Sequence, residues 1–238
     1  MAKNLERDLR LIFEFFLLVS RKDSCLEFVT IMHFYSYDVA PSPRRAVLLL
    51  RYKGVDLPTT QVDMRANEHR SDDYLAINPQ GTVPALMTDE GVLLTEVLAI
   101  CDYLDAKFPE KPVFGSTPLE RALVLNWMNK ISGSLFMAFA EMLRNGSPAF
   151  ANRALPGPID VKQIPELADR GRKRYRASLE LFEQEVGAHP FLCGEALSQA
   201  DIDMYIAIHT GSWVKESLPE SCVRLREWYA RTATALGE

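Results

Sequence analysis

Apolar and polar positions in the first half of the chain follow two different periods. Residues 33–37 (HFYSY) are aromatic and alternate, which predicts a β-strand. Residues 44–52 (RRAVLLLRY) carry apolar side chains at helical spacing and stop at Lys53-Gly54, a typical helix end. The pattern then predicts a strand at 57–62, a short helix near the polar stretch 63–73, a hairpin within 83–94, and a helix that Thr95 caps and that runs to about Lys107.

After Pro118 the pattern becomes purely helical. Apolar spacing predicts helices at 119–144, 165–186, 199–213 and 222–236, with a loop broken by proline and glycine at 146–164. No strand-like alternation occurs in this half. We therefore predict an α/β domain at 32–109, a linker at 110–118 and an all-helical domain at 119–238.

Residues 1–31 stand apart from this organisation. The apolar run Leu9 to Val19 is too short for a membrane span and is interrupted by Arg10 and Glu14. No small-residue cleavage site follows it, so a signal peptide is not predicted. Since Met32 directly precedes the first predicted strand, residues 1–31 are interpreted either as the product of a non-native upstream start or as a helix docked on the domain.

Composition narrows the possible functions. Lys+Arg 27 against Asp+Glu 32 gives a net charge of −5, which disfavours general binding to nucleic acid. The basic run between Arg170 and Arg176 lies among acidic residues, so we interpret it as a solvated helix face. Four widely spaced cysteines favour a reducing cytoplasm and neither a zinc ribbon nor a disulfide framework. No metal site and no membrane association are predicted.

Three local features can carry chemistry or structure. The Val83-Pro84 dipeptide opens a strand, and a cis bond there would leave the backbone of Val83 free to pair with a ligand, although most X–Pro bonds are trans. Thr95-Glu96-Val97 starts a helix, whose N–H groups suit a carboxylate while Glu96 suits an amine; an ordinary cap is the alternative. Ser198 with Asp201 forms a capping box, for which we predict a structural role only.

Taken together, these motifs resemble the cytosolic glutathione transferase superfamily. The resemblance rests on NPQGTVPAL, LLTEVLAICDYL and FLCGEALSQADI in this order, and it runs from about His33 to the C-terminus. It implies a thioredoxin-like α/β N-terminal domain, an all-α C-terminal domain and usually a homodimer. It also implies that the Val83–Pro84 bond is cis.

The resemblance assigns a glutathione site to this chain. Val83, held by Pro84, would pair with the cysteinyl main chain, and Glu96 with the helix start at Val97 would hold the γ-glutamyl group. The stretch 67–70 (NEHR) resembles the G-E-H-K segment of the plant phi class, which implies His69 and Arg70 as partners of the glycyl carboxylate. Glutathione would be a co-substrate.

Two residues depart from the family pattern. Val97 stands where members usually have Ser, and the missing hydroxyl bond would weaken glutathione binding by up to about tenfold. The catalytic Ser or Cys of the family lies five residues before the Arg of the first helix, and counting back from Arg45 gives Ala40. Ser42 is the nearest hydroxyl of this turn and the candidate catalytic residue. The alternative is that Ser42 only caps the helix, with Pro43 in its first position.

The resemblance also implies a small hydrophobic electrophile as the second substrate. Candidate walls for its pocket are Phe136, Phe139, Met142 and Trp213, although apolar residues at helical spacing are more often core. Two functions follow: an enzyme that promotes attack of the glutathione thiolate on such an electrophile, or a transferase-like fold kept as a non-catalytic binding or regulatory protein. The intact glutathione motifs favour the enzyme, while Ala40 and Val97 favour the alternative.

Overall fold

The α/β half of the molecule is built around a four-stranded mixed sheet. The computed structural model describes residues 17–22 and 25–238 of the chain. In the order β4-β3-β5-β6 the strands are Thr59–Gln61, His33–Ser36, Ala85–Met87 and Leu93–Leu94. Strand β3 runs parallel to β4 and antiparallel to β5, and β5 and β6 form the predicted hairpin.

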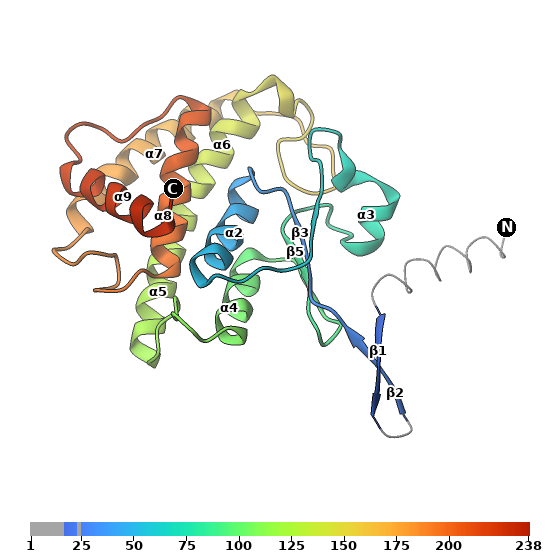
Figure 1. The fold of residues 1–238 in the computed structure, drawn as a ribbon. Coiled ribbons are helices and arrows are strands. Elements are labelled where there is room, and N and C mark those ends of the chain that lie inside the picture. The colour runs from blue at the N-terminus through green and yellow to red at the C-terminus, as the bar shows by residue number, and fades with distance from the viewer. Residues whose placement is uncertain (1–16, 23–24) are drawn as a thin grey trace.

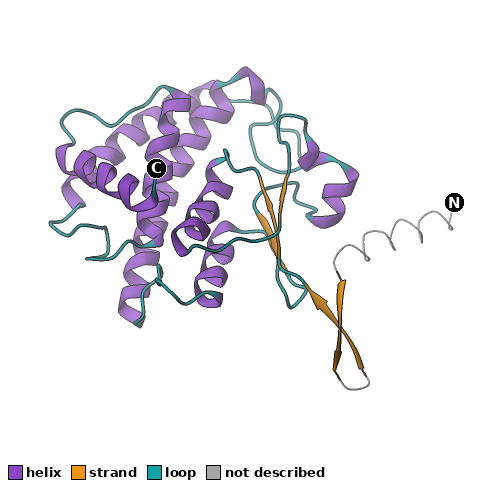
Figure 2. Ribbon diagram, in the orientation of Figure 1, coloured by secondary structure: helices purple, strands orange, loops and turns teal. Residues whose placement is uncertain are grey.

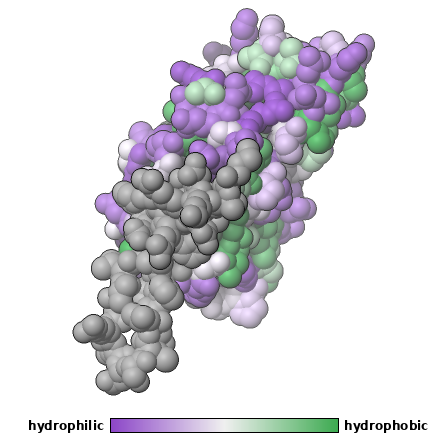
Figure 3. All heavy atoms as spheres, turned by 90° about the vertical axis from the view of Figure 1, so that its right-hand side faces the viewer, coloured by the Kyte–Doolittle hydropathy of each residue, from purple (hydrophilic) through white to green (hydrophobic). Residues whose placement is uncertain are grey.

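Helices cover both faces of this sheet. Helices α2 (Pro41–Lys53) and α4 (Val97–Lys107) lie on the face toward the helical half, whereas α3 (Asp72–Ile77) lies on the other face, after the 3-10 turn η1 (Glu68–Arg70) (Figure 1). A small cluster of Tyr35, Val62, Tyr74 and Ala85 fills the α3 side. Hydrophilic residues cover the upper part of this outer face (Figure 3).

The second half is entirely helical, as Figure 2 shows. Helices α5 (Pro118–Ile131) and α6 (Met137–Gly146) are joined without a break by a π-helical turn at Ser132–Phe136. Helices α7 (Pro165–Glu185), α8 (Gln199–His209) and α9 (Val223–Leu236) complete the bundle, together with the 3-10 segments η3 (Pro148–Phe150) and η4 (Thr210–Val214). The predicted element order is therefore confirmed from residue 33 onward.

Helix α8 forms the centre of the helical half. The predicted capping box is present, because the Ser198 hydroxyl and backbone N–H both donate to Asp201. Every residue from Gln199 to Ile208 is buried. The core is continuous from Leu48 and Leu49 of α2 to α8, so burial of apolar surface holds the two halves together.

A buried ion pair crosses the same junction. Arg45 of α2 donates to both carboxylate oxygens of Asp203 on α8, and Gln199 donates to Asp203 at 2.9 Å. Burial alone would lower the pKa of Arg45, but the Asp203 carboxylate more than reverses this, so the pKa lies above its usual value. The pair fixes α2, and with it the turn before α2, relative to the helical half.

Residues 17–22 and 25–30 form an antiparallel hairpin, so the docked helix, one of the two interpretations of residues 1–31, is wrong for this part. Leu17 pairs with Thr30 and Lys22 with Cys25 in the register of β1 (Leu17–Lys22) and β2 (Cys25–Thr30). The remainder of the predicted extension, residues 1–16 and 23–24, lies outside the described residues. The described part of the extension is thus β-structure added before β3.

No helix in the described part of the chain is both long and apolar enough to cross a membrane.

Candidate functional site

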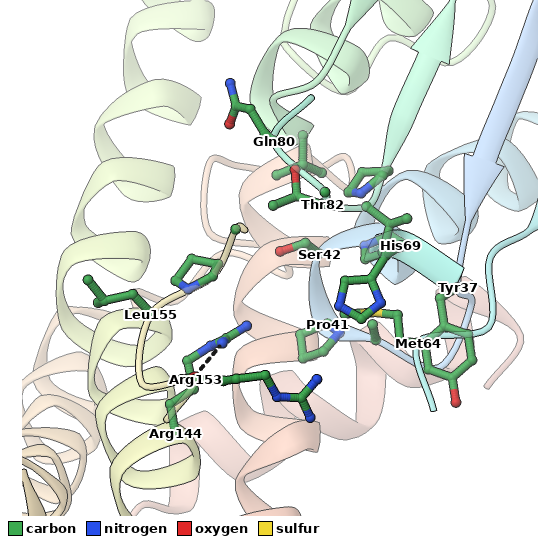
Figure 4. Close-up of a pocket in the computed structure, with 18 of the residues that line it drawn as sticks. Tyr37, Pro41, Ser42, Met64, His69, Gln80, Thr82, Arg144, Arg153 and Leu155 are labelled. Atoms are coloured by element: carbon green, nitrogen blue, oxygen red, sulfur yellow. Dashed lines mark hydrogen bonds between the residues drawn. The ribbon is translucent and has the colours of Figure 1, made fainter. Parts of the chain in front are cut away.

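A cavity of about 770 Å³ lies between the two halves, a volume that suits a small-molecule site. One wall comes from the α/β half: the turn before α2, the η1 turn, the entry to β5 and the start of α4. The other wall comes from the end of α6, the loop at 147–164, and Trp213. Figure 4 shows the two walls facing each other.

The turn before α2 carries Ser42 into the cavity, but Ser42 is not the helix cap. Ala40 is the N-cap residue, without a side-chain hydrogen bond, and Pro41 takes the first helical position. The prediction that Ser42 caps the helix with Pro43 next is therefore wrong, because both prolines fit in the first turn, where no N–H is needed. The Ser42 hydroxyl is exposed and points into the cavity (Figure 4).

The two prolines give this helix end an unusual donor set. The first four N–H groups of a helix have no partner within the helix. Here Pro41 and Pro43 have no N–H, and the Ala40 N–H donates to Tyr37 O at 2.8 Å. Ser42 therefore supplies both the free backbone N–H and the hydroxyl at the positive end of α2. The hydroxyl of Tyr37 points away from Ser42 (Figure 4).

The entry to β5 exposes the backbone of Val83 to the cavity. The Val83–Pro84 bond is cis, as the family resemblance implies, and both residues line the cavity. The preceding turn is rigid because the buried Asn78 amide donates to Thr82 O at 2.8 Å. Gly81 has φ +58, and a Cβ there would approach the His69 carbonyl oxygen to 2.9 Å. Glycine thus lets this turn pack against η1.

The start of α4 offers free N–H groups to the cavity. Glu96 is the N-cap residue and its side chain makes no capping bond, so the predicted cap at Thr95 is wrong by one position. The Ile100 N–H already bonds to Glu96 O, which leaves the amides of 97–99 available. Glu96 is exposed, and Glu96 and Val97 both line the cavity. An anion at the amides and a cation at Glu96 can bind side by side.

His69 and Arg70 lie on the η1 turn and also line the cavity. His69 is 8% exposed and its Nδ1 atom is buried without a hydrogen-bond partner. Burial, and then the positive charges of Arg153, Arg70 and Arg144, lower the pKa of His69 below its ordinary 6.5. Arg70 donates to Asp160 Oδ1 and to Pro158 O, both at 3.2 Å, and so links η1 to the loop 147–164.

The structure brings only one of the four predicted wall residues to the cavity. Trp213 lines it and is 47% exposed. Phe136 lies instead under the Arg45 guanidinium, 4.9 Å from its ring centre, and Phe139 packs edge-on against Trp213. Met142 is buried in the core. The structure therefore places Phe136, Phe139 and Met142 outside the lining of the cavity, because their side chains pack against Arg45, Trp213 and the core.

Apart from Trp213, the apolar part of the second wall comes from residues that the sequence did not single out. Its members are Leu143, Phe150, Leu155 and Pro156. Arg144 and Arg153 lie beside them (Figure 4). All except Leu143 and Arg144 belong to the loop 147–164, which has no apolar period. The prolines and glycines of this segment predicted a loop but not its position against η1.

The protein's own described thiols are poor nucleophiles. Burial raises the pKa of Cys101 and Cys222, and it raises the pKa of Cys193 to about 11. None of the three lines the cavity. Among the described residues, no group of three or more His, Cys, Asp or Glu side chains is placed to hold a metal ion.

Comparison with known proteins shows the family. A family model described as "Glutathione S-transferase, N-terminal domain" matches residues 40–107. Glutathione S-transferase 2 of Saccharomyces cerevisiae is 31% identical over 205 residues, which cover 84% of each chain. Maleylacetoacetate isomerase of Pseudomonas aeruginosa is 42% identical over 93 residues, 38% of this chain and 44% of the isomerase. The chain therefore belongs to the glutathione S-transferase superfamily and is an enzyme of the glutathione transferase type.

Solved structures confirm the fold class. A glutathione S-transferase domain-containing protein from Marinobacter aquaeolei VT8 superposes with a TM-score of 0.76 at 26% identity, covering 84% of this chain and 97% of that one. Gtt2 from Saccharomyces cerevisiae gives a TM-score of 0.75 at 26% identity, covering 86% of this chain and 98% of that one. The predicted glutathione transferase fold is thus confirmed.

Proposed function

We propose that the cavity binds glutathione along its α/β wall and promotes attack of the glutathione thiolate on a small hydrophobic electrophile held by the helical wall. One observation carries this proposal. The cis Val83–Pro84 entry, the uncapped start of α4 beside Glu96, and the His69–Arg70 turn all line a single cavity around the start of α2.

Each feature has a complementary group on glutathione. The backbone N–H and C=O of Val83 pair with the cysteinyl residue as in strand addition. The free amides at Val97 receive the γ-glutamyl carboxylate, and Glu96 pairs with the neighbouring ammonium. His69 and Arg70 take the glycyl carboxylate. This arrangement directs the cysteinyl sulfur toward the start of α2 and Ser42.

The free energy needed to lower the pKa of the glutathione thiol matches what the start of α2 can supply. A cysteine thiol has a pKa near 8.5, and lowering it by about 2 units takes about 2.7 kcal/mol. A hydrogen bond to a charged group contributes about 1.5–3 kcal/mol, and a helix N-terminus about 0.3–1 kcal/mol, up to about 2 in a partly buried site. The Ser42 hydroxyl and N–H together with α2 reach this sum without a side-chain donor at Ala40. Ser42 is therefore the proposed catalytic residue.

In the proposed reaction the sulfur of glutathione becomes bonded to a carbon atom of the electrophile. The thiol proton leaves to solvent, and the thiolate sulfur forms a bond to the electrophilic carbon. In a substitution the leaving group departs with its bonding electron pair; in an addition the electron pair moves onto the acceptor and is protonated by water. The apolar side chains of Phe150, Leu155 and Trp213 would hold the electrophile's carbon skeleton.

The working form that we propose is a homodimer in the cytoplasm. The described cysteines Cys101, Cys193 and Cys222 are free thiols, which is consistent with a reducing compartment. Homodimerisation rests on the family resemblance.

Calorimetry combined with an ultraviolet titration of the bound thiolate tests the function. We expect glutathione to bind with a thiol pKa well below its solution value, followed by turnover of a hydrophobic aryl halide. The second candidate, a non-catalytic binding protein, is favoured by Ala40 at the helix cap and Val97 at α4. Binding with an unshifted thiol pKa and no turnover would support that candidate and refute the proposed thiolate chemistry.

A further inference from the structure

The cavity carries more positive charge than its own acids balance. Four arginines line it, against the single carboxylate of Glu96 on the described lining: Arg65, Arg70, Arg144 and Arg153. Arg70 is already paired with Asp160 on the loop 147–164. The unbalanced charge on the helical wall therefore rests on Arg144 and Arg153.

Arg144 and Arg153 are held in place by neutral groups only. Arg144 donates to the Arg153 carbonyl oxygen at 3.1 Å, and its guanidinium lies 5.1 Å from the ring centre of Phe150. Arg153 donates to Asn67 Oδ1 at 2.7 Å and to Ala149 O at 3.0 Å. Within the described part of the chain neither guanidinium forms an ion pair. Both are half-buried, so water screens their charges incompletely.

The two arginines act on each other and on His69. Burial and the neighbouring Arg153 lower the pKa of Arg144, and both arginines contribute to the lowered pKa of His69. His69 also holds its buried Nδ1 atom without a partner. The guanidinium groups of Arg70, Arg144 and Arg153, which come from both walls, thus converge near His69 at one corner of the cavity.

A bound anion would relieve the repulsion between these guanidinium groups. Their N–H donors determine which shape of anion fits. Guanidinium groups present planar pairs of N–H donors that match a carboxylate in a bidentate manner. The rings of Phe150 and Trp213 bound the same wall, so the group that carries the carboxylate can keep apolar surface against them.

We propose that Arg144 and Arg153 form a carboxylate subsite on the helical wall of the cavity. The inference rests on the proposed function, because it adds a second cationic element to the glutathione transferase pocket. The carboxylate comes from one of two sources: the glycyl end of glutathione, reached across the cavity from η1, or an acidic group on the second substrate.

Matched acids and esters distinguish these sources in the unaltered protein. The first arm compares binding of glutathione with that of its glycyl ethyl ester by calorimetry. The second arm compares kcat/KM for a dinitro-activated aryl chloride that bears a carboxylate with kcat/KM for its methyl ester. We expect the acid to be favoured in at least one arm. Because His69 and Arg70 also favour the glycyl carboxylate, the source is the arm in which substitution of the two subsite arginines reduces the preference.

Variants then assign the preference to the subsite. Arg144→Gln and Arg153→Gln should each reduce the acid-to-ester ratio by about tenfold or more, the loss of one charge-assisted bond. The control is Arg121→Gln, because Arg121 also lies over an aromatic ring, that of Phe114, but pairs with Asp102 away from the cavity. It should leave both ratios unchanged, and thermal unfolding identifies any variant that fails to fold.

The outcomes separate the subsite from the function. Glutathione binding and turnover with acid-to-ester ratios that Arg144→Gln and Arg153→Gln leave unchanged in both arms would overturn the subsite and leave the proposed function in place. An acid preference that survives both arginine variants would also overturn it. No binding of glutathione and no turnover would overturn the function and the subsite together.

Discussion

Asp203→Asn tests how strongly the buried ion pair holds the two halves together. The Asp203 side chain is 0% exposed and that of Arg45 10% exposed, and the aspartate accepts bonds from Arg45 and Gln199. Removing one partner of a buried pair costs about 3–5 kcal/mol, because the other charge stays buried without compensation. Asparagine keeps the size of the side chain, so this loss is electrostatic and not a cavity effect. We expect the free energy of unfolding to fall by this amount.

Thermal and urea unfolding measure the loss. For a chain of this length about 1 kcal/mol corresponds to about 2–4 °C, so Tm should fall by about 6–20 °C. The control is Glu185→Gln, which breaks the Lys130–Glu185 pair, whose side chains are 40% and 41% exposed. An exposed pair contributes about 0–1 kcal/mol, so this variant should change Tm by only a few degrees.

A double substitution separates charge from packing. Arg45→Met with Asp203→Leu removes both charges and should recover most of the stability lost in Asp203→Asn. If Asp203→Asn and Glu185→Gln lower Tm equally, the buried pair does not hold the junction, and the reasoning is refuted. Apolar contacts between α2 and α8 would then account for it alone.

Four further substitutions test the α/β wall of the cavity, along which we propose that glutathione binds. Ser42→Ala should slow turnover by about tenfold or more while Tm changes little, since Ser42 is not the cap; equal loss of both would make its role structural. Glu96→Ala should weaken glutathione binding at least about tenfold by calorimetry, and unchanged affinity would remove Glu96 from the site. Val97→Ser adds a hydroxyl at the start of α4 and should strengthen the same affinity by up to about tenfold, whereas weaker binding would contradict the assignment. If His69 holds the glycyl carboxylate, the bound anion should raise the lowered pKa of His69, so S-methylglutathione should bind more tightly as the pH falls through the pKa of His69 in the complex. His69→Gln should abolish this dependence, and a dependence that persists would exclude His69.

The sequence predicts the fold well where periodicity and stop signals act locally. The helix over 44–52 ends at Gly54, whose φ of +69 makes the left-handed C-cap that glycine favours. The capping box of Ser198 and Asp201 fixes the start of α8 because its donors and acceptors lie within one turn. Such features depend on a few neighbouring residues, so the sequence contains all the information they need.

The start of α2 and the entry to β5 show where local rules become ambiguous. Pro41-Ser42-Pro43 permits more than one cap, since either proline suits the first turn and Ser42 is a good cap residue. The structure places the cap at Ala40. The cis bond at Val83–Pro84 was predicted only by the family resemblance, because the dipeptide alone favours trans.

The helical wall was the least predictable part of the site. The pattern over 119–144 predicts an uninterrupted α-helix, whereas the structure has a π turn at Ser132–Phe136, and only Leu143 and Arg144 of this stretch line the cavity. Arg153 reaches the site through Asn67, 86 positions earlier in the chain. Contacts of this separation come from tertiary packing of a loop, for which a single sequence has no period.

The two walls of the cavity have separate origins in the chain. The family match at 40–107 spans nearly all of the α/β wall, while the opposing wall comes from residues 143–157 and Trp213. A lineage can therefore keep one way of holding glutathione and exchange the partner molecule by altering a short segment elsewhere. For protein engineering, grafting 143–157 from a relative is the direct route to a new substrate, because Ser42 and the other residues that we propose to prepare the thiol stay unaltered.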